Sequence, residues 1–429
     1  MPRQAPASKR RPAAGTRRSE RAPDVALPAG IGDETETTIE RIVPGGLGLG
    51  YGGGRTLFVS QAAPGDRLRV RVDRERGRVA YASIVEVLQP GPDRIPVAYP
   101  ILARCGADFQ HLRYDAQLAA KQGMIADCLR RIGGLELAEP VPIHGSRQEW
   151  AYRSRAEWAY DANGDVLGYR EARTNRVVDL EVDPLVVPAL AETYAGLRQR
   201  LLSGAIPATV TEIRAAAGVD GVSIVPTFDA SPPLEVETRV GIEVYRYDAG
   251  AFFQANPFVL ETLVREALRL TPATGAAQDP DRRLAIDLYC GVGLFTLPMA
   301  REFDRVIGVE SDVRSAEYAA RNAETADLSN VRITSAIAEQ WLETAFKSYG
   351  RLPYLLLDPP RTGVPPRALH GITRMRPSRI TYVSCDPATL ARDLKALLAA
   401  GYELDGIAAI DMFPQTHHVE IVAHVQRVT

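Results

Sequence analysis

The sequence lacks any apolar run of the ~18 residues that a membrane-spanning helix needs, so we expect no membrane partner. It has only four cysteines in 429 residues, too few for a disulfide-stapled scaffold. Its first residues are basic and rich in proline and alanine, without the apolar stretch of a secretory signal. These absences favour a cytoplasmic protein. The length predicts two or three domains, each able to bury a core.

Net charge is also small, at −2, but it is unevenly distributed. Residues 1–30 carry seven basic and two acidic side chains, a balance of +5 that leaves −7 for the remainder. Residues 1–33 contain almost no large apolar side chain, so we expect a disordered basic tail. Such a tail either adds nonspecific affinity for nucleic acid by releasing counterions or only keeps the protein soluble.

The segment 34–92 predicts a small OB-like β-barrel, because short alternating stretches are separated by glycine-rich turns. Arg67, Arg69 and Arg71 fall on one face of a predicted strand by the two-residue period. This face is either an RNA contact or an ordinary solvated surface, since acidic residues are interleaved with it. The expected strands are Thr37–Val43, Leu57–Val59, Leu68–Val72 and Val79–Val87.

Gly48–Gly53 matches the glycine fingerprint of dinucleotide-binding folds by spacing alone. That fingerprint requires a strand before the glycines and a helix after them, but here a strand follows. We therefore expect these glycines to form turns rather than a cofactor site.

Residues 93–250 predict a mixed α/β central domain, and residues 251–429 alternate strands and helices in regular order. This alternation is typical of a doubly wound, mostly parallel sheet, whose ligands bind at the carboxyl ends of the strands. In the central domain we expect a helix over Tyr114–Ile132 and strands over Trp150–Tyr160 and Val177–Val182. In the C-terminal domain we expect strands Leu284–Leu288, Arg305–Val309, Val331–Thr334, Tyr354–Leu357, Ile380–Ser384 and Val419–Val425, and helices Leu294–Arg301 and Val313–Ala326.

A candidate cofactor loop, Asp287–Gly293 (DLYCGVG), ends the first of these C-terminal strands. Gly291 and Gly293 let a ligand approach the backbone closely, and Glu310 ends the next strand, where it can accept hydrogen bonds from both hydroxyls of a ribose. These features fit either a dinucleotide or S-adenosylmethionine. Thr296 replaces the third glycine that a pyrophosphate site uses, so the pattern favours S-adenosylmethionine, which carries no phosphate.

A second motif, Asp358-Pro-Pro-Arg361, follows another predicted strand. Amino-methyltransferases have an aromatic residue after a similar Asp-Pro-Pro, and that residue stacks on the base being methylated. Arg361 stands there instead, and its charge and donors suit a phosphate or a carbonyl of the substrate. N-methylation is therefore disfavoured. The alternative is that the prolines only end the strand.

Cys385 and Glu420 are the candidate reactive groups. Cys385 follows a strand and precedes a helix predicted to begin near Ala388, whose amides would favour a thiolate. Glu420 interrupts an otherwise apolar strand, which is costly unless the carboxylate is paired or used. We expect Cys128 and Cys290 to be buried structural thiols.

A thiolate, a carboxylate and a methyl donor fit one reaction. C5 of uracil is a poor nucleophile, but attack of a thiolate on C6 gives C5 carbanion character and lets it take a methyl group. A base must then remove the C5 proton before the thiol can leave. Cys385 and Glu420 would fill these two roles.

Together these motifs resemble the RNA uracil-C5 methyltransferases, which make 5-methyluridine in transfer and ribosomal RNA. The resemblance covers residues 36–429 and rests on Asp287–Gly293, Asp358–Gly363, Ser384–Pro387 and His418–Glu420. It implies an N-terminal TRAM domain that binds RNA, a Rossmann-like class I methyltransferase domain, and a base flipped into a pocket. It also implies these roles: Cys385 as nucleophile, Glu420 as general base, Phe252 stacked on the base, and Gln254, Tyr289, Glu310 and Asp358 against S-adenosylmethionine.

The sequence departs from the family where many members carry a four-cysteine iron–sulfur cluster. Only Cys105 remains in that region, and Tyr99 and Asp183 stand near two of the expected cysteines. A cluster that needs four thiolates cannot form, so we expect none. His417 and His418 could ligate a metal, but no further ligand set accompanies them, and we expect loop residues and no metal site.

Two further departures concern the cofactor. Leu294 replaces a polar residue often found after the second glycine, and Ile337 stands where an acidic or amide residue usually meets the adenine amine. They motivate a second hypothesis, a noncatalytic RNA-binding protein that kept the barrel. A third is C5 methylation of another pyrimidine, such as cytosine. We expect a monomer, and no pattern in the sequence identifies the uridine or the RNA.

Overall fold

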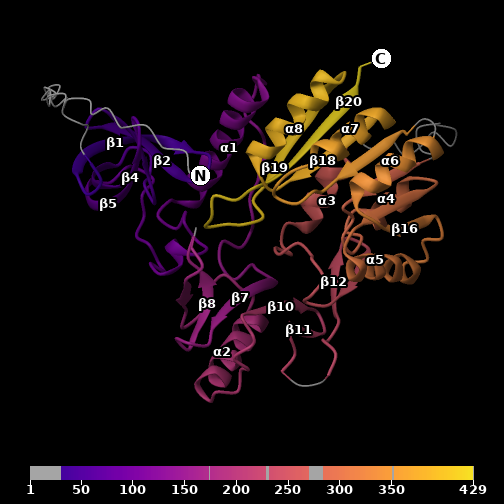
Figure 1. Ribbon diagram of the computed structural model, residues 1–429, viewed down its shortest axis with the longest axis horizontal. Coiled ribbons are helices and arrows are strands. Elements are labelled where there is room, and N and C mark those ends of the chain that lie inside the picture. Colours follow the sequence, from indigo (N-terminus) through magenta and orange to yellow (C-terminus); the bar gives the residue numbers. More distant parts are fainter. Residues whose placement is uncertain (1–29, 173, 229–230, 270–283, 350–351, 429) are drawn as a thin grey trace, which may run out of the picture.

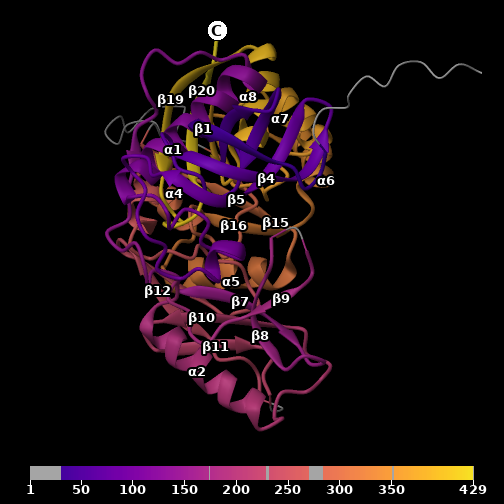
Figure 2. The ribbon, with the colours of Figure 1, turned by 90° about the vertical axis from the view of Figure 1, so that its left-hand side faces the viewer.

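A computed structural model describes residues 30–172, 174–228, 231–269, 284–349 and 352–428 (Figure 1). Nearly all of the predicted basic tail lies outside these residues. The described chain forms a closed β-barrel, an antiparallel sheet and a large mixed sheet, with a two-stranded hairpin besides. Figures 1 and 2 both show the antiparallel sheet and its helix at the end of the molecule away from the C-terminus.

The N-terminal barrel closes in the order β1-β2-β3-β5-β4, which confirms the predicted barrel. Leu57, Val59, Leu68 and Val70 fill it and are fully buried, because alternate residues of each strand point inward. Its strands are β1 (Glu34–Val43), β2 (Leu47–Gly52), β3 (Arg55–Val59), β4 (Arg67–Arg76) and β5 (Val79–Gln89).

The glycine-rich stretch corrects the prediction of turns, since Gly48, Gly50 and Gly52 lie within strand β2. A Cβ at Gly48 would lie 2.8 Å from the Cβ of Ala62, and one at Gly52 would lie 2.5 Å from the carbonyl oxygen of Glu36. Close packing of neighbouring backbone and side chains therefore requires glycine here. The turn that follows does use glycines with positive φ.

The antiparallel sheet has the order β11-β10-β7-β8-β9, and helix α2 (Pro188–Leu202) packs on it through Tyr194 against Trp158. Strand β7 begins at Arg155, later than predicted, and β9 ends at Asp179, earlier than predicted. The elements of this part are β7 (Arg155–Asp161), β8 (Val166–Arg170), β9 (Val177–Asp179), β10 (Glu212–Gly218) and β11 (Gly221–Val225), followed by the hairpin β12 (Val236–Val240) and β13 (Glu243–Tyr247).

Helix α1 (Tyr114–Cys128) links the barrel to the large sheet. It confirms the predicted helix and continues as one π-helical turn, Leu129–Gly133, which contacts helix α8 of the large sheet. The chain then adds a short strand, β6 (Ile143–His144), in parallel with β19 at the sheet edge. Cys128 is buried within this helix, as expected.

The large sheet has the order β16-β15-β14-β17-β18-β20-β19-β6, and its first five strands are parallel. Strand β20 pairs in antiparallel fashion with both β18 and β19. This confirms the doubly wound, mostly parallel sheet. Its strands besides β6 are β14 (Ala285–Leu288), β15 (Val306–Glu310), β16 (Val331–Ser335), β17 (Tyr354–Leu357), β18 (Arg379–Ser384), β19 (Tyr402–Ile410) and β20 (Glu420–Arg427).

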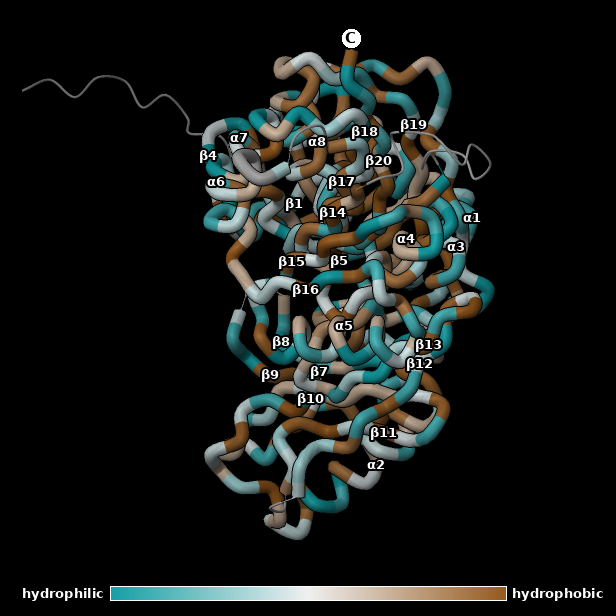
Figure 3. Tube along the Cα trace, turned by 90° about the vertical axis from the view of Figure 1, so that its right-hand side faces the viewer, coloured by the Kyte–Doolittle hydropathy of each residue, from teal (hydrophilic) through white to brown (hydrophobic). Residues whose placement is uncertain are grey.

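Helices cover both faces of this sheet, and hydrophobic residues concentrate along its central strands (Figure 3). Helices α1, α6, α7 and α8 form one core with it, and α3, α4 and α5 form the other. Among the described residues, no helix is both long and apolar enough to cross a membrane. The helices are α3 (Leu260–Leu268), α4 (Thr296–Glu302), α5 (Val313–Thr325), α6 (Ala338–Ser348), α7 (Pro366–Met375) and α8 (Pro387–Ala399).

Candidate active site

Nine of the residues singled out from the sequence line one cavity of about 570 Å³, whereas Gly293 and Ile337 are not among its lining residues. It lies where β14 separates β15 from β17, the position at which a doubly wound sheet reverses its strand order. These nine residues are Phe252, Gln254, Tyr289, Gly291, Glu310, Asp358, Arg361, Cys385 and Glu420. Other residues in the lining had no sequence signal that singled them out, among them Gly250, Phe253, Ser311, Asp312 and Ser315.

The loop after β14 is held open by positive φ angles at Tyr289 (67°), Gly291 (53°) and Gly293 (99°). The amide of Gly291 donates to Oε2 of Glu310 at 2.9 Å, and Oε1 of Glu310 accepts from the amide of Asp312 at 2.8 Å. These bonds fix the Glu310 carboxylate at the end of β15. The loop and the acidic strand end therefore form one preorganised wall of the cavity.

The same wall fits a nucleoside cofactor. A Cβ at Gly291 would meet no atom within 4 Å, so the backbone there faces open space that a ligand can approach. The hydroxyl of Tyr289 is buried and has no hydrogen-bond partner among the described residues, so it can donate to a ligand in this wall. Leu294 contributes an apolar side chain to the lining, while its carbonyl accepts from the hydroxyl of Tyr245 at 2.9 Å. Ile337 caps α6 and is about half exposed.

Asp358 is partly buried just after β17, and the side chain of Gln254 donates a hydrogen bond to it. Burial raises the pKa of Asp358 to about 7, with a further contribution from the negative charge of Glu310. The hydrogen bond from Gln254 acts in the opposite direction. Asp358 thus titrates near neutral pH in the cavity.

Cys385 follows β18, but its thiol is not activated as the sequence predicted. Asp386 is the N-cap of α8 and accepts a hydrogen bond from the amide of Thr389, so the Asp386 carboxylate occupies the helix terminus. Burial raises the pKa of Cys385 to about 12, and the negative charge of Glu420 adds to the rise. Arg361 opposes it. The isolated cavity therefore holds a thiol.

Glu420 is the first residue of β20 and is 2% exposed. Burial raises the pKa of its carboxyl well above the usual value, Asp358 raises it further, and Arg361 lowers it. The negative charges of Glu420 and Asp358 raise the pKa of Cys385, and Arg361 lowers the pKa of both Cys385 and Glu420. This part of the cavity thus brings together the thiol of Cys385, the carboxyl groups of Asp358 and Glu420, and the guanidinium of Arg361.

Phe252 is 64% exposed while its ring belongs to the cavity lining, so it stands at the open side. An exposed aromatic ring beside a cavity is suited to stacking against a planar base. Cys290, by contrast, is buried beneath the glycine loop, and burial raises its pKa well above the usual value, as a structural thiol requires.

Asp183, near an expected cluster cysteine, and His417, a possible metal ligand, both bond other side chains of the protein. Asp183 accepts hydrogen bonds from Nε1 of Trp158 at 2.9 Å and from the hydroxyl of Tyr169 at 2.6 Å. His417 pairs through Nδ1 with Asp108 at 2.7 Å. Within the described ranges, no group of three or more histidine, cysteine, aspartate or glutamate side chains is arranged to hold a metal.

A doubly wound sheet with a glycine loop, an acidic second strand and a reactive cavity at the switch point defines a Rossmann-like methyltransferase. The family model described as tRNA (Uracil-5-)-methyltransferase matches residues 231–428. The chain belongs to this family of S-adenosylmethionine-dependent RNA (uracil-5-)-methyltransferases.

Similar proteins agree with this assignment over nearly the whole chain. A 23S rRNA (uracil(1939)-C(5))-methyltransferase of Pseudomonas fluorescens is 33% identical over 92% of this chain and 94% of its own length. An RNA methyltransferase of Gloeobacter violaceus is 32% identical over 92% of this chain and 97% of its own. The crystal structure of Pyrococcus abyssi tRNA (uracil-54, C5)-methyltransferase in complex with S-adenosyl-L-homocysteine aligns with a TM-score of 0.68 and 25% identity, covering 91% of this chain and all of the other.

Proposed function

We propose that this protein methylates C5 of a uridine in transfer or ribosomal RNA through a covalent bond between Cys385 and C6 of the base. The observation that carries the proposal is that Cys385 and Glu420 line the same cavity as the glycine loop and Glu310. We also propose a functional division along the chain. Residues 34–92 bind RNA, residues 93–250 form a central part, and residues 251–429 carry the reaction, with the basic tail at 1–33.

The first step uses Cys385. Its thiol must lose a proton, and the positive charge of Arg361 favours the thiolate. The sulfur then bonds to C6, and the electron pair of the C5–C6 double bond moves to C5 and the O4 carbonyl as an enolate. Phe252 holds the base by stacking at the open side of the cavity, which positions C6 against the sulfur.

The second step uses Glu420. S-adenosylmethionine, when bound against Gly291, Glu310 and Asp358, supplies an electrophilic methyl group, and C5 accepts it. The Glu420 carboxylate then removes the proton from C5. The electron pair of that C–H bond re-forms the C5–C6 double bond, and the sulfur of Cys385 leaves as a thiolate. The product is 5-methyluridine, and the enzyme is restored once the proton on Glu420 is lost.

Two substitutions test this sequence of steps. Cys385→Ala is expected to abolish methyl transfer to uridine-containing RNA while leaving the affinity for S-adenosylhomocysteine unchanged in calorimetry. Glu420→Gln is expected to stop turnover and to accumulate a covalent RNA adduct on denaturing gels, because elimination needs the base. Robust turnover by the Cys385 variant would refute the nucleophile. Stopped turnover without an adduct in the Glu420 variant would give that carboxylate another role.

The target follows from product analysis. Mapping 5-methyluridine in total RNA from cells with and without this protein identifies the modified position. Base-resolved mass spectrometry of the product separates uracil from another pyrimidine such as cytosine. Absence of any S-adenosylmethionine binding would instead support the noncatalytic RNA-binding hypothesis.

We propose that the barrel binds RNA through a face other than the arginine stripe, the strand face that carries Arg67, Arg69 and Arg71. Arg67 pairs with Glu36 and Arg69 with Glu86, each at 2.8 Å, so much of the positive charge of that stripe is neutralised. A groove of about 620 Å³ instead lies between the barrel and the end of α1. It is lined by the rings of Tyr51, Phe58 and Tyr81, by Arg130 and Arg131, and by Ala388. Glu40 and Asp127 line it too, and Asp127 pairs with Arg130 at 2.7 Å, so part of its positive charge is also neutralised.

This groove has the composition of a site for single-stranded nucleic acid, where bases stack on aromatic rings and arginines contact phosphates. Arg74 lies 4.2 Å from the centroid of the Tyr81 ring and adds positive charge beside it. Ala388, which belongs to the groove, is three residues from Cys385 in the sequence. Tyr81→Ala is expected to raise KM for RNA severalfold without changing kcat, whereas the matched Arg67→Ala leaves both unchanged. Equal effects of the two variants would contradict this assignment.

A further inference from the structure

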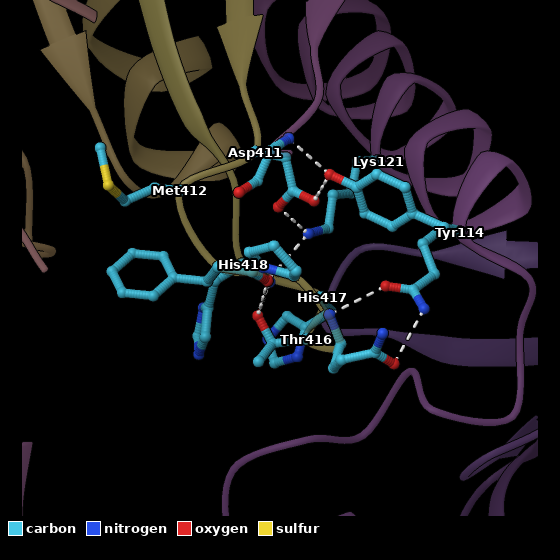
Figure 4. A network of polar contacts seen from close by, with 12 residues as sticks. Tyr114, Lys121, Asp411, Met412, Thr416, His417 and His418 are labelled. Carbon is cyan, nitrogen blue, oxygen red and sulfur yellow. Dashed lines mark hydrogen bonds and ion pairs between the residues drawn. The ribbon is translucent and has the colours of Figure 1, made fainter. Parts of the chain in front are cut away.

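The segment 411–419, which joins β19 to β20 and leads directly into Glu420, is held by one face of helix α1. Tyr114, Gln117 and Lys121 recur at the three- and four-residue spacing of a helix face, and all three bond this segment. Figure 4 shows Lys121 and the Tyr114 ring both reaching from helix α1 toward Asp411. These partners are about 290 residues apart in sequence.

The strongest contact is the ion pair between Lys121 and Asp411. Nζ of Lys121 lies 2.5 Å from Oδ1 of Asp411, and both side chains are fully buried. The same ammonium donates to the carbonyl of Phe413 at 3.1 Å. The hydroxyl of Tyr114 donates to the other carboxylate oxygen of Asp411 at 2.8 Å and accepts from the amide of Ser146. The donors and acceptors of this cluster are thus matched.

Further bonds fix the rest of the segment. The amide of Gln415 donates to Oε1 of Gln117 at 2.9 Å, and the carbonyl of Gln415 accepts from the amide of Phe109 at 2.8 Å. The hydroxyl of Tyr152 donates to the carbonyl of Pro414 at 3.0 Å. The segment therefore has the polar contacts of an ordered element although it forms neither helix nor strand.

The cluster is placed to control Glu420. Ile410 is the direct partner of Glu420 in the β19–β20 ladder, and Asp411 is the next residue after Ile410. A shift of Asp411 therefore moves the backbone position against which Glu420 is registered. A buried ion pair is a weak source of stability compared with apolar residues of similar volume, but it requires one geometry of its partners.

We propose that Lys121, Asp411 and Tyr114 are positioning residues that hold the Glu420 carboxylate where it can remove the C5 proton. This inference rests on the proposed role of Glu420 as the base. Loosening the cluster should spare the steps before proton removal and slow elimination of the sulfur. A purely structural cluster predicts instead that any variant with restored stability has restored turnover.

The test replaces the ion pair by an apolar pair of similar volume, Lys121→Met with Asp411→Leu. We expect at least a tenfold fall in kcat, unchanged affinity for S-adenosylhomocysteine, and accumulation of the covalent RNA adduct on denaturing gels. The matched control is Arg379→Met with Asp405→Leu. It removes a 2.8 Å ion pair between the first residue of β18 and a residue within β19, neither of which lines the cavity. That control should turn over like the wild type without adduct.

The outcomes separate the inference from the proposed function. If Glu420→Gln accumulates adduct but the stable apolar pair turns over at the wild-type rate, the positioning role is wrong and the reaction scheme stands. If Glu420→Gln forms no adduct, the base role fails and this inference fails with it. Should the apolar pair not fold, Tyr114→Phe decides, because it removes one hydroxyl only. A severalfold lower kcat with adduct and unchanged KM for RNA supports positioning, and wild-type kinetics overturn it.

Discussion

Replacing Asp287 by asparagine should change how the stability of this enzyme depends on pH. Asp287 lies in β14 beneath the cofactor loop and is fully buried. Its Oδ2 accepts from the hydroxyl of Thr296 at 2.6 Å, while its Oδ1 is buried without a partner. Burial raises the pKa of this carboxyl from 3.8 to about 8, the Thr296 hydrogen bond opposes the rise, and nearby Asp358 adds to it.

The sign follows from the protons bound in each state. The folded protein keeps the proton on Asp287 up to about pH 8, whereas the unfolded chain releases it near pH 3.8. Between these values folding takes up a proton, so the free energy of unfolding falls as pH rises. The slope is about 1.4 kcal/mol per pH unit, which amounts to roughly 4 kcal/mol between pH 5 and pH 8.

Urea unfolding of wild type and Asp287→Asn at pH 5, 6, 7 and 8 measures this slope. The amide bears no charge, so its own cost of burial does not vary with pH, and the variant should gain about 4 kcal/mol relative to wild type over this range. Thr296→Val is the matched control. Losing the hydroxyl raises the pKa of Asp287 further, so the free energy of unfolding should continue to fall to a higher pH than in wild type. If the difference in the free energy of unfolding between wild type and Asp287→Asn stays constant with pH, the reasoning is refuted.

Three further predictions concern the cavity and the positioning cluster. Gly291→Ala should lower the free energy of unfolding by about 1 kcal/mol, because alanine is disfavoured at this positive φ. It should also weaken S-adenosylhomocysteine binding at least tenfold in calorimetry, because the added methyl group enters the cavity; unchanged affinity contradicts this. The rate of adduct formation in a single turnover should rise from pH 6 to pH 9, because the pKa of Cys385 is raised to about 12 and the thiolate fraction grows with pH; a flat profile would count against a thiolate attack. Lys121→Met alone should cost about 3–5 kcal/mol in urea unfolding because Asp411 stays buried without its cation, and the further change Asp411→Leu should recover most of it; equal stabilities of the two variants would contradict this.

The position of the site could be predicted because its residues sit at strand ends. Parallel strands place their carboxyl ends at one edge of the sheet, so Glu310, Asp358 and Cys385 had to meet once their strands were recognised. Glu420 reaches the same edge from the opposite direction, because β20 is antiparallel and the residue opens the strand. Local sequence was sufficient for this part of the structure.

The ionisation of Cys385 was mispredicted, although a signal was present. Asp386 followed by Pro387 is a typical N-cap and first helical residue, and this pair takes the helix amides that were assigned to the thiol. The remaining cause, burial beside Glu420, depends on contacts between strands that are 35 residues apart in the chain. Periodicity does not report such desolvation.

The positioning cluster was beyond sequence reasoning for a related cause. The sequence around Lys121 predicts a helix but not what its buried face contacts. Asp411 follows β19, which pairs with the edge strand β6. Nothing in either segment indicates the other. The glycines of Gly48–Gly53 are followed by a strand, as predicted, but those within β2 are required by close tertiary contacts rather than by turns.

The electrostatics of the cavity suggest why its groups act in order. In the isolated cavity, burial raises the pKa values of Asp358, Glu420 and Cys385, and the charge of Glu310 adds to the rise for Asp358 as that of Asp358 does for Glu420. Arg361 is the one nearby charge that opposes these rises for both Glu420 and Cys385. A cationic sulfonium entering the same cavity acts in the direction of Arg361 and favours the thiolate and the carboxylates. Under the proposed mechanism, the bound methyl donor favours the Cys385 thiolate and the Glu420 carboxylate before transfer. The loss of its positive charge on transfer then raises the proton affinity of Glu420, which next takes the C5 proton.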